Sequence, residues 1–276
     1  MNKGPLLLAV GGIIVAVFMF QLPKSVVDDG DEVLVDNSTV NTPPSSSEAG
    51  TVNHSQPLPQ ELRPKIEALK ADLMASENTG DFPKFADSLA DVYFSAAWYD
   101  SAGHYAAIAA EANPGVETWT KAANYHYEAF SFAMDGLSQA AEAQLAAKYL
   151  NLVLEAEPSN LDIKAKLGMT YVVGENPMQG ILLMRDVVEE DPTNVMALFN
   201  LGMLSRQSGQ TEKAVERFEA VLEIEPDNLQ AMFFLGVSYQ EIGDQERARQ
   251  TYEELLDMTT DPAIVETVEG MMSEME

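Results

Sequence analysis

Cysteine is absent from this chain of 276 residues, and histidine is rare. Without cysteine there is no disulfide, thiolate metal site, cysteine nucleophile or cysteine-linked lipid anchor. The three histidines, His54, His104 and His126, form no metal-binding motif, and no phosphate-binding loop, nucleophile elbow or HExxH sequence is present. We therefore expect no catalytic residue, no cofactor and no metal site, and we do not expect an enzyme.

Basic residues are also few, with 16 Lys and Arg against 44 Asp and Glu, for a formal net charge of -28. A polyanion is repelled by nucleic-acid phosphates, so we expect no nucleic-acid partner. Two interpretations of the acidic surface remain open. The charge keeps the protein soluble, or it attracts a basic partner.

A long apolar run stands near the N-terminus, where residues 6–20 carry no polar side chain. From Gly4 to Pro23 a helix would be roughly 30 Å long, the thickness of a bilayer core. A cleaved signal peptide is the alternative, but no site after Phe20 has small residues at the spacing that cleavage requires. We predict an uncleaved signal anchor over residues 5–23, with the short tail 1–4 in the cytoplasm.

The next segment, residues 24–58, is acidic and rich in serine and proline, and it has no basic residue after Lys24. Low hydrophobicity and charge of one sign prevent the burial of enough apolar surface to order a chain. We predict a disordered acidic linker here and a folded domain over residues 59–276.

The folded part repeats itself at intervals of 34 residues. Prolines close each unit, a Leu-Gly pair follows, and a small residue and then a large apolar residue come next. The positions are Pro158, Pro192 and Pro226; Leu167-Gly168, Leu201-Gly202 and Leu235-Gly236; Gly180, Ala214 and Ala248; and Met184, Phe218 and Tyr252.

This pattern resembles the tetratricopeptide repeat (TPR). The resemblance implies an all-α, right-handed α-solenoid of helical hairpins, in which small residues let paired helices approach and large ones fill the gaps. We expect about five hairpins and a polar C-terminal cap, of the type that membrane-anchored bacterial proteins carry. Their ranges are 83–116, 116–160, 161–194, 195–228 and 229–261, with the cap at 262–276.

The second hairpin has 11 residues more than the 34-residue spacing. The addition, near Ser131–Ala141, is either a longer helix pair or a protruding loop, and the sequence leaves both open. His126 stands where the repeat normally packs an aromatic side chain, so we expect it to lie in the core and bind no ligand.

In this family the first helix of each hairpin lines a concave groove that binds peptides. A second apolar stripe on these first helices, at helical spacing, predicts the groove here. The alternative is that neighbouring helices cover this stripe and make it part of the core. The predicted groove residues are Met169, Met196, Phe199, Asn200, Met203, Arg206, Phe233 and Val237.

The resemblance implies a non-enzymatic scaffold or adaptor that binds a protein or peptide partner, basic or apolar in character. We place it in the bacterial inner (cytoplasmic) membrane through residues 5–23, with the repeat domain in the periplasm, where it captures a segment of an envelope protein. One alternative is a homo-oligomeric structural protein. Another, by analogy alone, is an assembly factor for c-type cytochromes or a partner of periplasmic chaperones.

Overall fold

The computed structural model describes residues 57–174 and 176–275, and all regular structure in these ranges is helical. A 3-10 turn, η1 (Gln60–Leu62), leads into α2 (Arg63–Ala75). Five antiparallel hairpins and a last helix follow. They are α3 (Phe82–Ser95) with α4 (Tyr99–Ala112), α5 (Val116–Phe132) with α6 (Gly136–Ala156), α7 (Leu161–Val173) with α8 (Pro177–Glu190), α9 (Val195–Gln207) with α10 (Thr211–Ile224), α11 (Leu229–Glu241) with α12 (Gln245–Met258), and α13 (Pro262–Ser273). The prediction of an all-α chain is confirmed for these residues.

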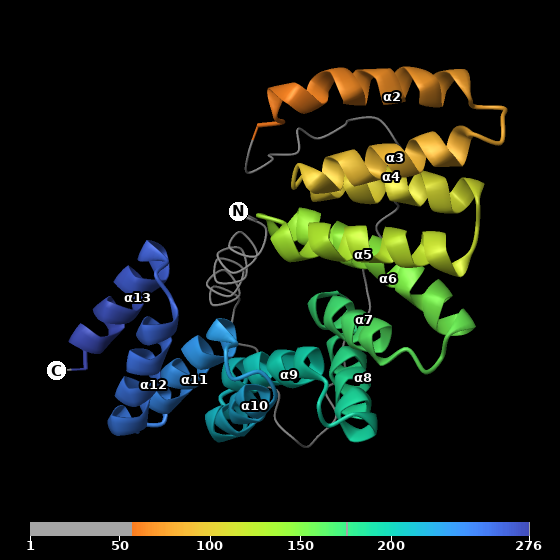
Figure 1. Ribbon diagram of the computed structural model, residues 1–276. Helices are drawn as coiled ribbons and strands as arrows, with labels where there is room; N and C mark the ends of the chain where they lie inside the picture. The colour runs from red at the N-terminus through yellow and green to blue at the C-terminus, as the bar shows by residue number, and fades with distance from the viewer. Residues whose placement is uncertain (1–56, 175, 276) are drawn as a thin grey trace, which may run out of the picture.

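The hairpins stack side by side along a bent path (Figure 1), so that each packs mainly on its neighbours in the sequence. First helices also meet across hairpins, since α5 contacts α7, α7 contacts α9 and α9 contacts α11. Around the lower bend of Figure 1, α7 and α9 lie on the inner side and α8 and α10 on the outer side. The first helices therefore form an inner layer, where the radius of the bend is smaller and spacing is tighter.

An asparagine begins the first helix of each of the last three hairpins. The side chains of Asn160, Asn194 and Asn228 accept hydrogen bonds from the amides three residues on, at 3.2, 3.0 and 2.9 Å. Each bond satisfies one of the amides that a helix leaves unpaired at its N-terminus. The residues after each repeated proline therefore set where the next hairpin starts.

Replacing Asn228 with alanine is expected to lower the free energy of unfolding by about 1 kcal/mol, because the Ala231 amide loses its acceptor. Asn228→Asp keeps an acceptor at the same place and should stay within about 0.5 kcal/mol of the parent. Urea unfolding of the three proteins, followed by circular dichroism, measures both values. Equal losses in the two variants would show that the cap bond is not the cause.

Glycines allow the two helices of a hairpin to approach closely. In the fourth and fifth hairpins the glycine faces an aromatic ring, whereas in the third hairpin it faces the backbone of the other helix. A Cβ atom on Gly202 would lie 2.8 Å from the ring of Phe218, and one on Gly236 would lie 2.4 Å from the ring of Tyr252. In the third hairpin a Cβ atom on Gly180 would lie 2.3 Å from the backbone oxygen of Gly168. Here backbone meets backbone, so this is the tightest of the three crossings.

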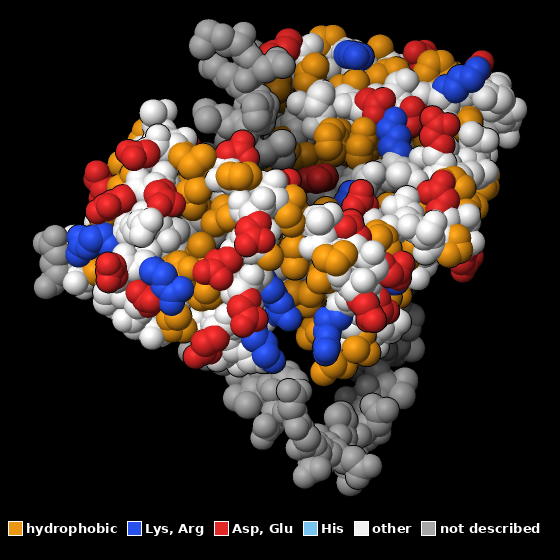
Figure 2. Space-filling view, turned by 60° about the horizontal axis from the view of Figure 1, so that its bottom comes forward, with side chains coloured by type: hydrophobic (Ala, Val, Ile, Leu, Met, Phe, Trp, Pro, Cys, Tyr) orange, Lys and Arg blue, Asp and Glu red, His pale blue; other side chains and the backbone are white. Residues whose placement is uncertain are grey.

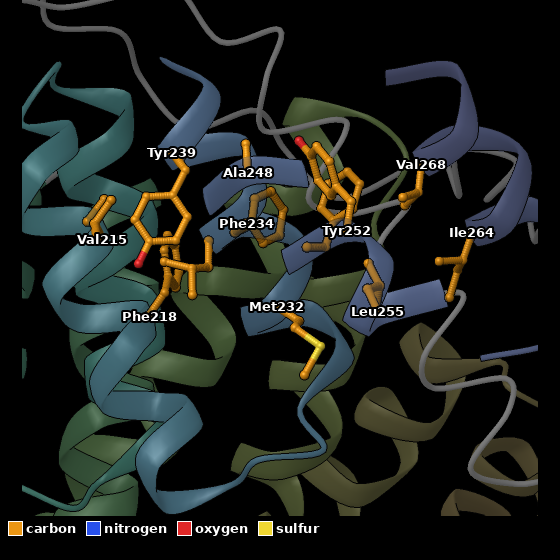
Figure 3. Packing of buried hydrophobic residues seen from close by; sticks show 13 residues of the cluster. Val215, Phe218, Met232, Phe234, Tyr239, Ala248, Tyr252, Leu255, Ile264 and Val268 are labelled. Carbon is orange, nitrogen blue, oxygen red and sulfur yellow. The ribbon is translucent and has the colours of Figure 1, made fainter. Parts of the chain in front are cut away.

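The C-terminal hairpins share one buried apolar cluster, which Figure 3 shows from close by. The fully buried rings of Phe218 and Tyr252 lie in it, and Ile264 and Val268 of α13 complete it at the chain end. The outer positions Glu266 and Glu269 of α13 are exposed. The last helix thus covers the open apolar face of the fifth hairpin and presents acid to solvent, as a cap must.

The second hairpin is a longer helix pair, not a protruding loop. Helices α5 and α6 have 17 and 21 residues, against 13 and 14 for α7 and α8. Only Ala133–Asp135 join them, and Asp135 caps α6 by accepting from the amides of Leu137 and Ser138. The additions of four and seven residues are close to one and two helical turns, so each helix keeps the same face toward its neighbours.

The predicted anchor over residues 5–23 and most of the predicted linker over 24–58 lie outside the described residues. Within residues 57–174 and 176–275, no helix is both long enough and apolar enough to cross a membrane.

Candidate functional site

The apolar stripe on the inner layer is partly exposed on α9 and α11. The side chains of Met196, Phe199, Met203 and Val237 are neither fully buried nor fully exposed. Phe199 lies with its ring centroid 5.7 Å from that of Phe218, and it packs against the C-terminal core together with Met203 and Val237. The stripe is therefore an extension of the core that reaches the surface.

Two of the predicted groove residues lie inside the core instead. Met169 is 6% exposed and packs with Phe130 and Ala143 of the long second hairpin. Phe233 is 4% exposed and belongs to the cluster that α13 completes. Neighbouring helices therefore cover these two residues, as the alternative expects, and they are not part of the exposed stripe.

The two polar residues predicted for the groove lie on α9. The side chain of Arg206 is 7% exposed, and its Nε donates to Oε1 of Glu241 at 3.0 Å. Its guanidinium also lies 5.4 Å from the centre of the Phe234 ring. Asn200 is partly exposed. The positive charge of Arg206 is thus already paired across to α11.

The inner layer of the first two hairpins is polar and charged. Lys121 of α5 contacts Asp87 and Asp91 of α3 at 2.6 and 2.7 Å, and the Tyr125 hydroxyl donates to Asp91 at 2.7 Å. Burial lowers the pKa of Lys121, but hydrogen bonds to the two aspartates outweigh it and raise the pKa overall. These contacts connect α3 of the first hairpin with α5 of the second. The side chains of both aspartates remain at the surface.

A second polar group, which the sequence analysis did not single out as a site, lies between α5 and α7. Lys166 donates to Oδ1 of Asn124 at 2.5 Å and lies 5.4 Å from the centre of the Tyr127 ring. Burial lowers the pKa of Lys166 and raises the pKa of Glu128, while the attraction between the two charges opposes both shifts. The spacing of Asn124, Tyr127 and Glu128 along one helix is the signal that could have identified this group.

His126 lies in the core, where its ring is 2% exposed and parallel to that of Tyr149. Its Nδ1 is 2.6 Å from Oε2 of Glu142, and its Nε2 has no hydrogen-bond partner among the described residues. A Cβ atom on Gly103 would lie 2.7 Å from Nδ1, so the imidazole occupies the close approach of α4 to α5. Within residues 57–174 and 176–275, no group of three acidic, histidine or cysteine side chains is arranged to hold a metal ion.

Residues 193–261 match the family model described as "Tetratricopeptide repeat". This segment of the chain is therefore similar to the tetratricopeptide repeat. It comprises the fourth and fifth hairpins, α9–α12, in which the glycine faces an aromatic ring. None of the curated proteins matches the chain significantly.

Solved structures extend the likeness to more of the chain. A tetratricopeptide repeat protein from Parabacteroides merdae superposes with a TM-score of 0.57 at 14% identity, over 77% of this chain and 79% of that one. A thermophilic TPR protein from Thermus thermophilus does so with a TM-score of 0.51 at 16% identity, over 70% and 98%. At such identities the shared property is the fold alone, a TPR-like solenoid of helical hairpins. MamA protein is a further neighbour, with a TM-score of 0.48, 18% identity, and 65% and 93% of the two chains covered.

Proposed function

We propose that this chain is a non-enzymatic scaffold that holds a peptide segment of another protein against the inner layer of its TPR solenoid. The observation that carries the proposal is the partly exposed apolar stripe of Met196, Phe199, Met203 and Val237. Flexible methionine side chains suit adaptable apolar recognition. Phe233 belongs to the core cluster against which Phe199, Met203 and Val237 pack.

The setting of this activity is part of the same proposal and rests on the sequence. The apolar segment 5–23 anchors the chain in the bacterial inner membrane with its N-terminus in the cytoplasm, and the acidic segment 24–58 tethers the solenoid in the periplasm. A tether confines the search for an envelope partner to a layer near the membrane and so raises its effective concentration. An assembly factor for c-type cytochromes or a partner of periplasmic chaperones fits this arrangement by analogy.

Photocrosslinking tests the proposed surface. We place p-benzoylphenylalanine at Met203 on the inner layer or at Glu253, which is exposed on α12, and irradiate the full chain in membranes of its source cells. We expect Met203 to yield one discrete adduct and Glu253 to yield none, because Met203 belongs to the proposed binding surface and Glu253 lies on α12, outside it.

The mass of the adduct separates the two candidate functions. A mass unrelated to that of the 30.1 kDa chain identifies a partner. A mass of two chains supports the homo-oligomeric structural protein and contradicts the scaffold. Adducts of equal yield from both positions would show that the inner layer has no special role.

A further inference from the structure

Four aromatic side chains form a continuous row across the first two hairpins. The rings of Phe94 and Tyr125 stack with centroids 4.2 Å apart, and those of Tyr99 and Phe132 stack at 4.9 Å. Phe94 and Tyr99 join the two pairs edge to face at 5.3 Å. All four side chains are partly exposed, so the row lies at the surface, where α3, α4 and α5 meet.

Glu128 stands in the middle of this row. Tyr125, Glu128 and Phe132 lie three and four residues apart on α5, so they share one face of the helix. Burial and the charge of Glu128 both raise the pKa of Tyr99, so the carboxylate lies near this ring of the row. The side chain of Glu128 is partly buried, and this burial raises the pKa of Glu128.

Within residues 57–174 and 176–275, the carboxylate of Glu128 receives no hydrogen bond and forms no close ion pair. The nearby cation is Lys166, which favours the charged form of Glu128 but donates its own hydrogen bond to Asn124. A half-buried carboxylate without a hydrogen bond is costly, and a cation that donated hydrogen bonds to it would reduce this cost.

A guanidinium group matches this arrangement better than other cations do. It is planar, so it stacks on an aromatic face, and it donates two parallel hydrogen bonds to one carboxylate. Figure 2 shows that acidic side chains outnumber basic ones on the face in view, in accord with the net charge of -28. The net charge of the chain therefore favours a basic partner.

We propose that Glu128 and the aromatic row of Phe94, Tyr99, Tyr125 and Phe132 form a subsite for an arginine side chain of the partner peptide. The inference rests on the proposed function and specifies the partner. The bound segment is amphipathic, with an arginine at α5 and apolar side chains at the stripe on α9 and α11. Asp87 and Asp91 of α3, paired with Lys121, extend the acidic end of the layer.

The test uses a short fluorescein-labelled peptide with one central arginine, and a copy in which citrulline replaces the arginine. Citrulline keeps the shape of the side chain and removes its charge. By fluorescence anisotropy with the full chain, we expect the arginine peptide to bind about tenfold more tightly than the citrulline peptide. Glu128→Gln should abolish this difference and should leave the circular dichroism spectrum unchanged.

Glu155→Gln is the matched control, because it removes the same charge from an exposed position at the end of α6. It should keep the tenfold difference. If Glu155→Gln weakens binding as much as Glu128→Gln does, net charge is the cause and the subsite does not exist. Equal binding of the two peptides by the parent chain, or equal displacement by tetramethylammonium and by free arginine amide, also overturns the proposal.

The two proposals fail independently. If the crosslinker at Met203 finds no partner but the arginine effect depends on Glu128, the scaffold proposal is wrong and the cation subsite remains. If Met203 finds a partner but Glu128→Gln has no effect on the peptides, the scaffold stands and the arginine subsite is wrong.

Discussion

Replacing Gly180 with alanine is expected to lower the free energy of unfolding by about 3 kcal/mol or more. The added Cβ atom would lie 2.3 Å from the backbone oxygen of Gly168 and 2.7 Å from the backbone nitrogen of Val172. Backbone atoms of a packed helix cannot rotate away as the end of a side chain can. Helices α7 and α8 would have to separate, and the apolar contacts between them would be lost.

Urea unfolding of the full chain, followed by circular dichroism, measures this loss. Gly270→Ala in α13 is the matched control, since a Cβ atom there meets nothing within 4 Å. Alanine favours a helix over glycine by up to about 1 kcal/mol, so the control should be neutral or slightly more stable. A Gly180→Ala protein as stable as the Gly270→Ala protein would contradict the close backbone crossing of the third hairpin.

Truncation of Phe218 to alanine is expected to cost about 3–5 kcal/mol. The side chain is fully buried, and its ring lies 5.7 Å from that of Phe199 and 6.0 Å from that of Phe234. It therefore joins α10 to both α9 and α11. Removing it opens a cavity between the fourth and fifth hairpins.

Two signals locate the effect along the chain. Trp98 and Trp119 are the two tryptophans, and both lie in the first two hairpins, so their fluorescence reports on that end. Stability in repeat proteins is mainly a sum over neighbouring units. We expect Phe218→Ala to shift the circular dichroism transition to lower urea while the tryptophan transition moves little.

Ile224→Ala, at a side chain 38% exposed near the end of α10, is the control and should cost less than about 1 kcal/mol. If Phe218→Ala shifts both signals equally, the solenoid unfolds as a single cooperative unit and the effect is not local. A cost as small as that of Ile224→Ala would contradict the packing of Phe218 itself.

The hairpins could be predicted from the sequence because the residues that specify each repeat lie close together in the chain. Leu201-Gly202, Ala214 and Phe218 lie within one hairpin, and their counterparts recur 34 residues on, so each unit could be identified without knowledge of the rest. The long second hairpin was found from the same spacing. Its form was not, because 11 additional residues fit a loop as well as they fit one and two further helical turns.

The candidate site was only partly predictable. Phe199 and Phe233 occupy the same register in successive repeats, yet Phe199 is partly exposed and Phe233 is 4% exposed. Both rings pack on the same apolar cluster, Phe233 as one of its buried members and Phe199 at its edge, so the register alone does not set their burial. The aromatic row around Glu128 was missed because Phe94 and Tyr99 precede α5 in the chain and meet Tyr125 and Phe132 only across hairpins.

The sequence by itself determined the all-α class, the order of the hairpins, the acidic charge and the apolar segment near the N-terminus, since each is a property of composition or of short-range periodicity. The tertiary structure alone decided which apolar side chains of the inner layer reach the surface and which half-buried carboxylate receives no hydrogen bond. Burial and charge pairing depend on side chains that neighbouring helices bring from distant parts of the chain. A 34-residue period specifies the repeating unit, but it does not specify how the long second hairpin and the last helix change the surroundings of equivalent positions.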